Sequence, residues 1–502
     1  MKPGPRACHP YTHSSSQKDP IMQDPVTTAL LLPDSQERSA LWSEAVAEAE
    51  SFFESVRSLP VTPQLDMAEL TSLLDTFPFD EPSSRIDVLR RYTGALSRHQ
   101  VHTPHPCYFG LFNPAPTFMG IIGDLIVATF NPQLAAWSHS PLAAETERRL
   151  IEAFAAKFGL PRDSDGCLTI GGAEANQTAL LCALAARWPS LPDDGLQSLS
   201  VRPAFYASAE SHHSFLKAAR MAGLGGAALR IVPVNDQLEM DPAALRERIE
   251  RDRKAGFEPF LIVATAGTTS AGVIDPLAEL SEIARANGLW FHVDAAWGGA
   301  AVLVPELRSA LSGIETADSI TFDPHKYLSI PMGAGMFLTR HPGILSSTFS
   351  VSTAYMPKEG ERLAAVDPFS HSLQWSRRFI GLKLFLTLAT TGWNGYAEVI
   401  RHQAQMGDHL RERLIATGWH IVNRTPLPTV CFIPANESWD MPMHRRACDA
   451  VLQTGRAWIS TVSLDGKQPA LRACISNYRT GPEDIETLID VLATVRNGLA
   501  KK

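Results

Sequence analysis

The sequence predicts an α/β protein built on a mostly parallel sheet that is flanked by helices. Between about residues 165 and 340, short apolar runs such as PFLIVAT, LWFHVD and DSITF alternate with helical stretches. This alternation is typical of crossover units around a buried parallel sheet, whose strands are apolar on both faces. Helix boundaries support it, since Asp241-Pro242 and Asp275-Pro276 each offer a capping residue followed by proline, and Gly288 follows the second helix.

Four segments are expected along the 502 residues. Residues 1–27 predict a disordered leader, because they are polar and lack the apolar stretch of a signal peptide. Residues 28–107 carry amphipathic helices that are too few to fold alone, so we expect them to pack on something else. Residues 108–382 predict the large α/β domain, and residues 383–502 a small C-terminal α+β domain.

The composition excludes several classes of partner. Hydrophobic residues make up 45% and charged residues 20% of the chain, and the formal net charge is -8. A chain of this charge is not expected to bind nucleic acid or an anionic membrane. The seven cysteines are scattered and form no CxxC pair, which favours reduced, mostly buried thiols in a cytoplasmic protein. A small molecule is therefore the expected partner.

Polar residues follow the predicted strands at their carboxyl ends, where open α/β sheets bind their ligands. Thr265 ends PFLIVAT and Asp294 ends LWFHVD, while DSITF leads into Asp323, His325 and Lys326. Alone, such an aspartate is more often a turn residue and such a lysine a solvated one. Together they predict a crevice in which a desolvated amine becomes a nucleophile toward a carbonyl group.

A glycine-rich turn and a histidine complete this predicted crevice. In LTIGGAEANQTALL, Gly171, Gly172 and Ala173 precede an uninterrupted helix and predict either a tight turn or an anion cradle of backbone N–H groups. The turn matches neither a Walker A loop nor a dinucleotide fingerprint. His212 follows the run PAFYAS, and its flat ring suggests a stacking surface for an aromatic cofactor. No metal site is expected, because HExxH and Cys/His clusters are absent from the sequence.

Several motifs in register resemble one enzyme family. The chain contains HPCYFG, WSHSPLAAETE, GGAEAN, SHHS, GTTSAG, HVDAAWGG, DPHK and LRACISNYRTGPEDI in that order. This set is similar to the group II pyridoxal-phosphate-dependent amino acid decarboxylases, which act on aromatic amino acids, histidine, glutamate or cysteine sulfinate. The resemblance covers about residues 35 to 495. It implies fold type I, with a mostly parallel seven-stranded sheet, a cofactor-binding large domain and an N-terminal segment that forms a homodimer.

The resemblance also implies roles for the residues of the crevice. Lys326 would bind the aldehyde of pyridoxal 5'-phosphate covalently, and Asp294 would keep the ring nitrogen protonated so that the ring accepts electrons. His212 would stack on the ring and take part in catalysis. The remaining cofactor contacts would come from Gly172, Ala173, Thr265, Ala296, Asp323 and His325.

Two further residues carry expectations about the substrate. Arg377 in WSRRF would hold a carboxylate, alone or together with His325, or else form a structural ion pair. Tyr355 lies in the polar segment STAYMPKEGER, which is either an ordinary loop or, as the resemblance implies, a loop that closes over the neighbouring subunit's site. Its hydroxyl would then protonate the substrate carbon after CO2 leaves.

The sequence as a whole predicts a homodimeric, cytoplasmic enzyme that decarboxylates an L-amino acid to an amine. Another reaction with the same cofactor, such as aldehyde formation, a lyase step or transamination, stays open, as does a catalytically inactive homologue. Three departures from the family pattern accompany the resemblance. Ala173 stands where many members have a hydroxyl residue, Asp323 stands where the aromatic decarboxylases have asparagine, and the segment YLSIPMGAGMF differs from both the glutamate and the aromatic branches. The identity of the amino acid substrate is left open.

Overall fold

The computed structural model describes residues 30–351 and 365–499, and Cys8 and Tyr355 lie outside these ranges. The chain divides into two compact units. One unit is formed by Met1–Ser55 and Asp66–Arg98, and the other by Val56–Leu65 and His99–Lys502. The domain boundaries expected at residues 28, 108 and 383 stay predictions.

The first unit consists of the helices α2 (Ser35–Ser55), α3 (Met67–Leu74) and most of α4 (Arg85–His99). Ion pairs join α4 to α2, one of them between Arg85 and Glu37 at 2.8 Å. Neither α2 nor α3 buries a residue, and α4 buries only Ala95. Large apolar side chains stay exposed instead, among them Leu31, Trp42, Met67, Phe79 and Tyr92. The described part of this unit therefore builds almost no core of its own.

The second unit is organised around a seven-stranded sheet with the strand order β1-β7-β6-β5-β4-β2-β3. The strands are β1 (Asp165–Thr169), β2 (Arg202–Ser208), β3 (Leu229–Val232), β4 (Phe257–Thr265), β5 (Trp290–Asp294), β6 (Ser319–Phe322) and β7 (Gly335–Thr339). Every pair is parallel except those of β7, which runs antiparallel to both β1 and β6. The predicted mostly parallel sheet is thus confirmed.

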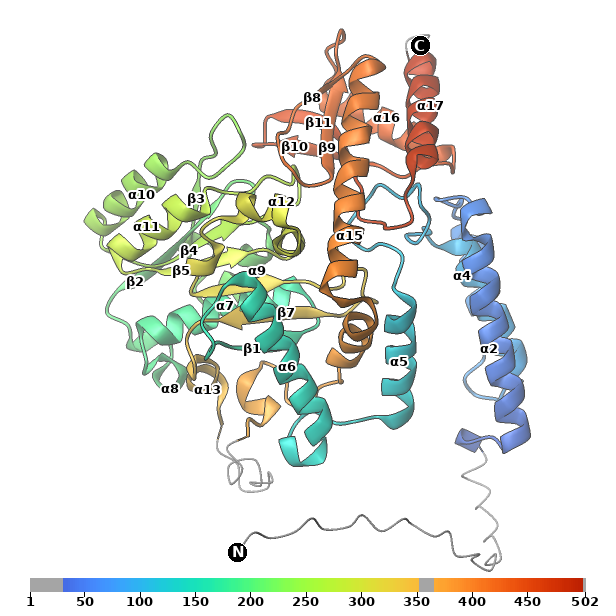
Figure 1. Cartoon of the computed structure of the whole chain (residues 1–502), viewed down its shortest axis with the longest axis horizontal. Helices are drawn as coiled ribbons and strands as arrows, with labels where there is room; N and C mark the ends of the chain where they lie inside the picture. Colours follow the sequence, from blue (N-terminus) through green and yellow to red (C-terminus); the bar gives the residue numbers. More distant parts are fainter. Residues whose placement is uncertain (1–29, 352–364, 500–502) are drawn as a thin grey trace, which may run out of the picture. The chain divides into compact units, whose positions relative to one another are not determined.

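Helices cover both faces of this sheet (Figure 1). On one face, α6, α10 and α11 contribute to a large core with Leu150, Leu245 and Leu280, whereas α7, α9 and α13 build a second core on the other face. The bounds of the helices around the sheet are α5 (Phe118–Phe130), α6 (Pro141–Phe158), α7 (Gly172–Arg187), α8 (Leu191–Asp194), α9 (Ser214–Met221), α10 (Pro242–Lys254), α11 (Leu277–Asn287), α12 (Pro305–Arg308) and α13 (Ile344–Phe349).

The predicted helix boundaries hold with one correction. Asp241 caps α10 by accepting the backbone N–H groups of Ala243 and Ala244, and Gly288 ends α11 in the left-handed conformation. Asp275 does not cap α11, contrary to the expectation. Its two carboxylate oxygens instead accept the N–H groups of Thr265 and Met240, each at 2.7 Å. The carboxylate therefore ties the end of β4 to the chain before α10.

The C-terminal part forms a four-stranded antiparallel sheet with the order β10-β11-β9-β8. Its strands are β8 (Trp419–Ile421), β9 (Thr429–Pro434), β10 (Ser460–Leu464) and β11 (Gln468–Cys474), packed by α16 (Met441–Gln453) and α17 (Pro482–Leu499). The long α15 (Gly381–Ala416) extends from beside the large sheet to this small one (Figure 1). It bends at Gly392, whose backbone angles, φ 67° and ψ 170°, are not helical. These strands and helices are the α+β elements that the sequence predicts for the C-terminal part of the chain.

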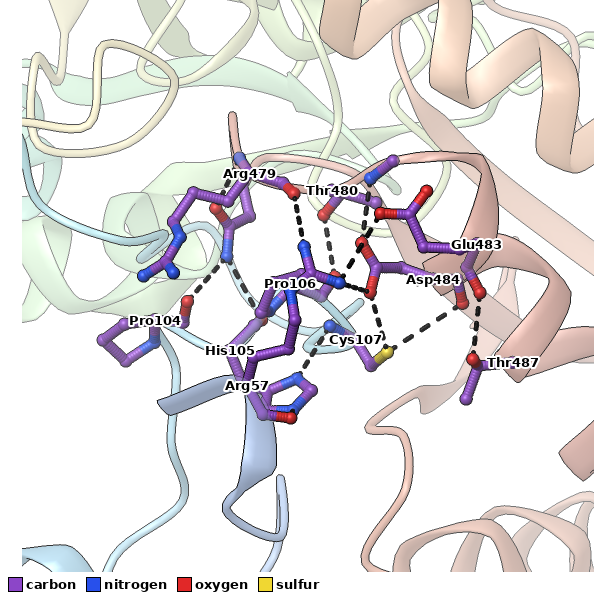
Figure 2. Close-up of polar contacts among 12 residues, drawn as sticks. Arg57, Pro104, His105, Pro106, Cys107, Arg479, Thr480, Glu483, Asp484 and Thr487 are labelled. Carbon is purple, nitrogen blue, oxygen red and sulfur yellow. Dashed lines mark hydrogen bonds and ion pairs between the residues drawn. The ribbon is translucent and has the colours of Figure 1, made fainter. Parts of the chain in front are cut away.

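A polar cluster ties the segment HPCYFG to the start of α17 (Figure 2). The guanidinium of Arg57 donates to Asp484 Oδ1 at 2.7 Å, and the thiol of Cys107 lies 3.5 Å from the same oxygen. Thr480 Oγ1 donates to the carbonyl oxygen of Pro106 at 2.7 Å. Because Asp484 is buried, these contacts hold the chain that leads to Phe112 in a fixed place.

Two sequence-wide features complete the description. The six cysteines of the described residues are free and buried, as the scattered spacing predicts. Within the described ranges, none of the helices combines the length and apolar character that a membrane crossing needs.

Candidate active site

The carboxyl ends of three neighbouring strands bring the predicted residues together. Thr265 at the end of β4 is the register partner of Asp294 at the end of β5. Asp323 follows β6 directly, and its backbone N–H donates to the carbonyl oxygen of Ala296 at 2.8 Å. Lys326 is held in the same turn, since its N–H donates to the carbonyl oxygen of Asp323. These turns therefore bring together the residues that were expected to line the crevice.

Lys326 presents its amine inside this crevice. Nζ lies 3.0 Å from Asp323 Oδ2 and 5.9 Å from the centre of the Phe112 ring. The lysine side chain is 23% exposed, whereas that of Asp323 is only 1% exposed. The amine thus has one buried counter-charge and is open to a small molecule on its other side.

Asp294 is a buried carboxylate with both oxygens occupied. Oδ2 accepts the side-chain N–H of Asn176 at 2.8 Å, and Oδ1 accepts the backbone N–H of Ala296 at 3.1 Å. These two bonds fix the orientation of the carboxylate. Asp294 can accordingly accept a further proton donor that enters the crevice.

The N-terminus of α7 faces the same turn. A Cβ atom at Gly172 would lie only 2.8 Å from Asp323 Oδ2 and 3.3 Å from the Cβ of Ala296, so glycine is required by this close packing. The first N–H groups of a helix have no partner within it and attract anions. Ala173 and Glu174 continue the first turn, but Glu174 accepts bonds from Ile170 N and Gln374 Nε2. Its charge is thus directed at other donors.

Two histidines border the crevice. His212 is an exposed residue whose Nδ1 accepts the N–H of Ser214 at 3.2 Å. Part of its ring is nevertheless buried, and this desolvation lowers the pKa of the ring, while the negative charge of Asp294 opposes the shift. His325 is buried, with Nδ1 2.7 Å from the carbonyl oxygen of Ala334. Burial lowers its pKa also, against the opposing charge of Asp323. Both environments favour neutral rings.

Arg377 is placed differently from the residues at the strand ends. Its guanidinium forms an ion pair with Glu147 of α6, and each of the two side chains is 4% exposed. Glu147 also accepts the backbone N–H of Gly381 at 3.0 Å, at the start of α15. This is the geometry of the structural ion pair that the sequence left open for Arg377.

Three side chains near the crevice were not singled out from the sequence. Phe112 stacks on Trp297 with ring centres 4.6 Å apart, and the guanidinium of Arg472 lies 5.0 Å from the centre of the Phe112 ring. Arg472 is 1% exposed, and its Nη2 has no hydrogen-bond partner among the described residues. The third side chain, Asn176, lies in the quoted motif GGAEAN. The one sequence signal for Arg472 is a charge inside the apolar strand ALRACIS.

Comparison with known proteins identifies the family. The model of the pyridoxal-dependent decarboxylase conserved domain matches residues 69–434. The chain belongs to this family. It is 28% identical over 427 residues to tryptophan decarboxylase 2 of Oryza sativa, covering 83% of this chain and 86% of the relative. It is 31% identical over 361 residues to an L-aspartate decarboxylase of Metarhizium robertsii, covering 71% and 72% of the two chains.

Solved structures of family members share the fold. The crystal structure of Oryza sativa TDC with PLP and tryptamine superposes with a TM-score of 0.87 at 25% identity, covering 93% of this chain and 99% of that one. The fold is therefore that of the fold type I decarboxylases. The resemblance seen in the motifs of the sequence is confirmed.

The crevice of this family member fits pyridoxal phosphate. Lys326 supplies an amine for the aldehyde, Asp294 a fixed acceptor for a protonated ring nitrogen, and α7 an N-terminus for the phosphate. Asp323 is the exception. Its Oδ1 is buried without a hydrogen-bond partner among the described residues, and its Oδ2 abuts Gly172. An acid at the mouth of an anion site opposes phosphate binding.

Proposed function

We propose that this chain is a pyridoxal-phosphate-dependent decarboxylase that converts an L-amino acid to its amine and CO2. The observation that carries the proposal is the pairing of Lys326, whose amine is open to the crevice, with the fixed carboxylate of Asp294 on the neighbouring strand. When bound, pyridoxal phosphate supplies an electron-accepting ring that stabilises charge on the substrate's α-carbon. The protein must bind, orient and protonate around that ring.

Each proposed role follows from a position in the crevice. Lys326 would hold the cofactor through its aldehyde, and Asp294 would face the ring nitrogen and accept its proton in a hydrogen bond. His212 would border the ring and could assist proton transfer. The backbone of Gly172 and Ala173 receives the phosphate at the N-terminus of α7. Thr265, Ala296, Asp323 and His325 line the rest of the cofactor site.

For the substrate carboxylate we propose Arg472 in place of Arg377. The guanidinium of Arg472 is buried and uses Nε and Nη1 on the carbonyl oxygens of Ser270 and Gly110, each at 3.1 Å. Its Nη2 lacks a partner among the described residues, and a buried cation of this kind favours a carboxylate. Arg472 and Lys326 lie near the same Phe112 ring. His325 borders this space, and Tyr355 is retained as the proton donor proposed from the sequence.

A homodimer is also part of the proposal. The described residues of the first unit leave large apolar side chains exposed, including Leu31 at 92% and Phe79 at 101%. Apolar surface of this extent favours a partner chain, and a second copy is the simplest one. Light scattering after size exclusion should give twice the mass of 54.8 kDa. A monomer would contradict this part of the proposal.

The test of the function is incubation of the protein and pyridoxal phosphate with the twenty common amino acids, cysteine sulfinate and diaminobutyrate. We expect CO2 and an amine from one of them, and loss of both in Lys326→Ala. Borohydride reduction followed by peptide mass analysis should place the cofactor on Lys326. An aldehyde with ammonia, or a keto acid, would indicate a different reaction on the same scaffold. A protein that binds no cofactor would refute the proposal.

Arg472→Lys tests the carboxylate role separately. We expect the KM of the substrate to rise while the cofactor still binds, since lysine keeps the charge and loses the planar pair of donors. Arg472→Met should raise KM further. Unchanged KM values in both variants would remove Arg472 from substrate binding.

A further inference from the structure

A row of buried polar side chains follows β5 from Asp294 at its carboxyl end to Trp290 at its amino end. Trp290, His292 and Asp294 are alternate residues of β5 and so point to the same face. Ser319 of β6 and Asn176 of α7 fill the gaps between them. Trp290 is 8% exposed and the other four side chains are 4% exposed or less. Buried polar groups of this number must be satisfied by one another.

The contacts join these side chains in sequence. Trp290 Nε1 lies 2.8 Å from Ser319 Oγ, which lies 2.8 Å from His292 Nδ1. His292 Nε2 is 3.3 Å from Asn176 Oδ1. Asn176 Nδ2 then lies 2.8 Å from Asp294 Oδ2 and 2.9 Å from Ser214 Oγ.

The chemistry of these groups allows only one direction of donation that satisfies every contact. The indole of Trp290 can only donate, so Ser319 Oγ accepts from it. The Asp294 carboxylate can only accept, so Asn176 turns Nδ2 to it and Oδ1 to His292, whose Nε2 must then donate and whose Nδ1 accepts the hydrogen of Ser319. The neutral ring then carries its hydrogen on Nε2 and donates to Asn176 Oδ1. The opposite orientation of the Asn176 amide would bring the amide oxygen against the carboxylate oxygen.

Burial supports the neutral form of the histidine. His292 is fully enclosed, and this desolvation lowers its pKa to about 4, against the opposing charge of Asp294. A cationic ring would also have to donate from Nδ1, which would leave the hydroxyl hydrogen of Ser319 without this acceptor.

We infer that Asn176 and His292 are positioning residues, which present an N–H donor to Asp294 Oδ2 and so orient this carboxylate toward the ring nitrogen that the cofactor would bring to it. Together with the Ala296 N–H on Oδ1, the donor fixes both oxygens of Asp294. Ser319 and Trp290 complete the row at the amino end of β5, where Ser319 donates to His292 Nδ1 and accepts from Trp290 Nε1. The inference rests on the proposed function, because it assigns these residues to the same cofactor site.

The same strands provide a matched control. Thr321 Oγ1 also lies 3.3 Å from His292 Nε2, but the side chain of Thr321 forms no hydrogen bond with Asn176 or Asp294 in the described part of the chain. Thr321→Val removes this hydroxyl with almost no change in shape. Ser319→Ala removes the hydroxyl that donates to His292 Nδ1, and Asn176→Ala removes the N–H that donates to Asp294 Oδ2.

The first experiment measures pyridoxal phosphate affinity and the pH midpoint of the bound cofactor's absorbance. Because a hydrogen bond to a buried charge is lost, Asn176→Ala should weaken cofactor binding by about tenfold or more. Ser319→Ala should shift the absorbance midpoint in the same direction as Asn176→Ala, and Thr321→Val should leave both quantities at the wild-type values. Equal effects of Ser319→Ala and Thr321→Val, or none in Asn176→Ala, would overturn the inference. A wild-type protein that binds no cofactor would instead refute the proposed function.

The second experiment needs no cofactor, and its one variant, His292→Gln, must retain the signals of the other buried histidines. In cofactor-free wild-type protein labelled with 15N-histidine, the ring of His292 should have a protonated Nε2 and an unprotonated Nδ1 throughout about pH 6 to 8. The signal is assigned by its absence from His292→Gln. A cationic ring, or a ring with its hydrogen on Nδ1, would overturn the direction of the row.

Discussion

Replacement of Arg377 by methionine separates the two interpretations of this arginine. The change leaves Glu147 buried at 4% exposure without its counter-charge, while its bond from Gly381 N stays. Removing one partner of a buried ion pair costs about 3–5 kcal/mol. We therefore expect Arg377→Met to lower the free energy of unfolding by about this amount. The KM for the substrate should hardly change.

The assay is urea unfolding followed by tryptophan fluorescence, combined with steady-state kinetics. Glu147→Gln keeps an oxygen that can accept the N–H of Gly381, so the double variant should cost less than the sum of the single ones. Arg378→Met is the matched control from the same motif. Its side chain is 52% exposed and pairs with Asp124 at the surface, so about 0–1 kcal/mol is expected. An Arg377→Met variant that unfolds like wild type but has a KM raised about tenfold would refute the structural role.

Three further predictions concern single groups. Asp323→Asn should strengthen pyridoxal phosphate binding by about tenfold in a fluorescence titration, because it removes a buried charge beside Gly172 and the ion pair of Lys326; weaker binding would contradict this. Burial raises the pKa of Asp275 to about 7, so its neutral form stabilises the fold fully below about pH 4 and this contribution is lost as pH rises through 7. Between pH 5 and pH 8, urea unfolding should show that wild type loses more free energy of unfolding than Asp275→Asn does. Equal losses in the two proteins would contradict the raised pKa of Asp275. In a Cys8→Ser background, no thiol should react with Ellman's reagent before unfolding, because burial raises the pKa of all six described cysteines; fast labelling in native buffer would show otherwise.

The fold was largely predictable because its strands are local apolar runs separated by well-marked helices. Strand direction was not. GMFLT, which becomes β7, is fully buried like the parallel strands β5 and β6, yet it returns antiparallel beside β6. The twelve-residue connection from Phe322 to Gly335 contains no helix and instead forms the turn that carries Lys326. A crossover to a parallel strand normally needs a helix in that space.

The site was predictable where a residue's position along a strand decides its place. Thr265, Asp294 and the turn of Lys326 meet because parallel strands end at one edge. Contacts between distant segments were not predictable in this way. Asp275 has the local pattern of a cap, but the N–H groups it accepts are 10 and 35 residues away. Asn176 and Asp294 are separated by 118 residues, and nothing local distinguishes Asn176 from an ordinary helix residue.

The bend of α15 has a consequence for mutational tolerance. No atom lies within 4 Å of the position that a Cβ on Gly392 would occupy, so packing allows a larger residue there. Its backbone angles, however, belong to a region that residues with a Cβ rarely adopt. If the outcome of saturation mutagenesis were predicted from steric contacts alone, position 392 would be classed as tolerant of substitution. Selection should instead retain glycine, since any replacement would pull the two halves of α15 toward one straight rod and change the angle at which the small sheet meets the large one.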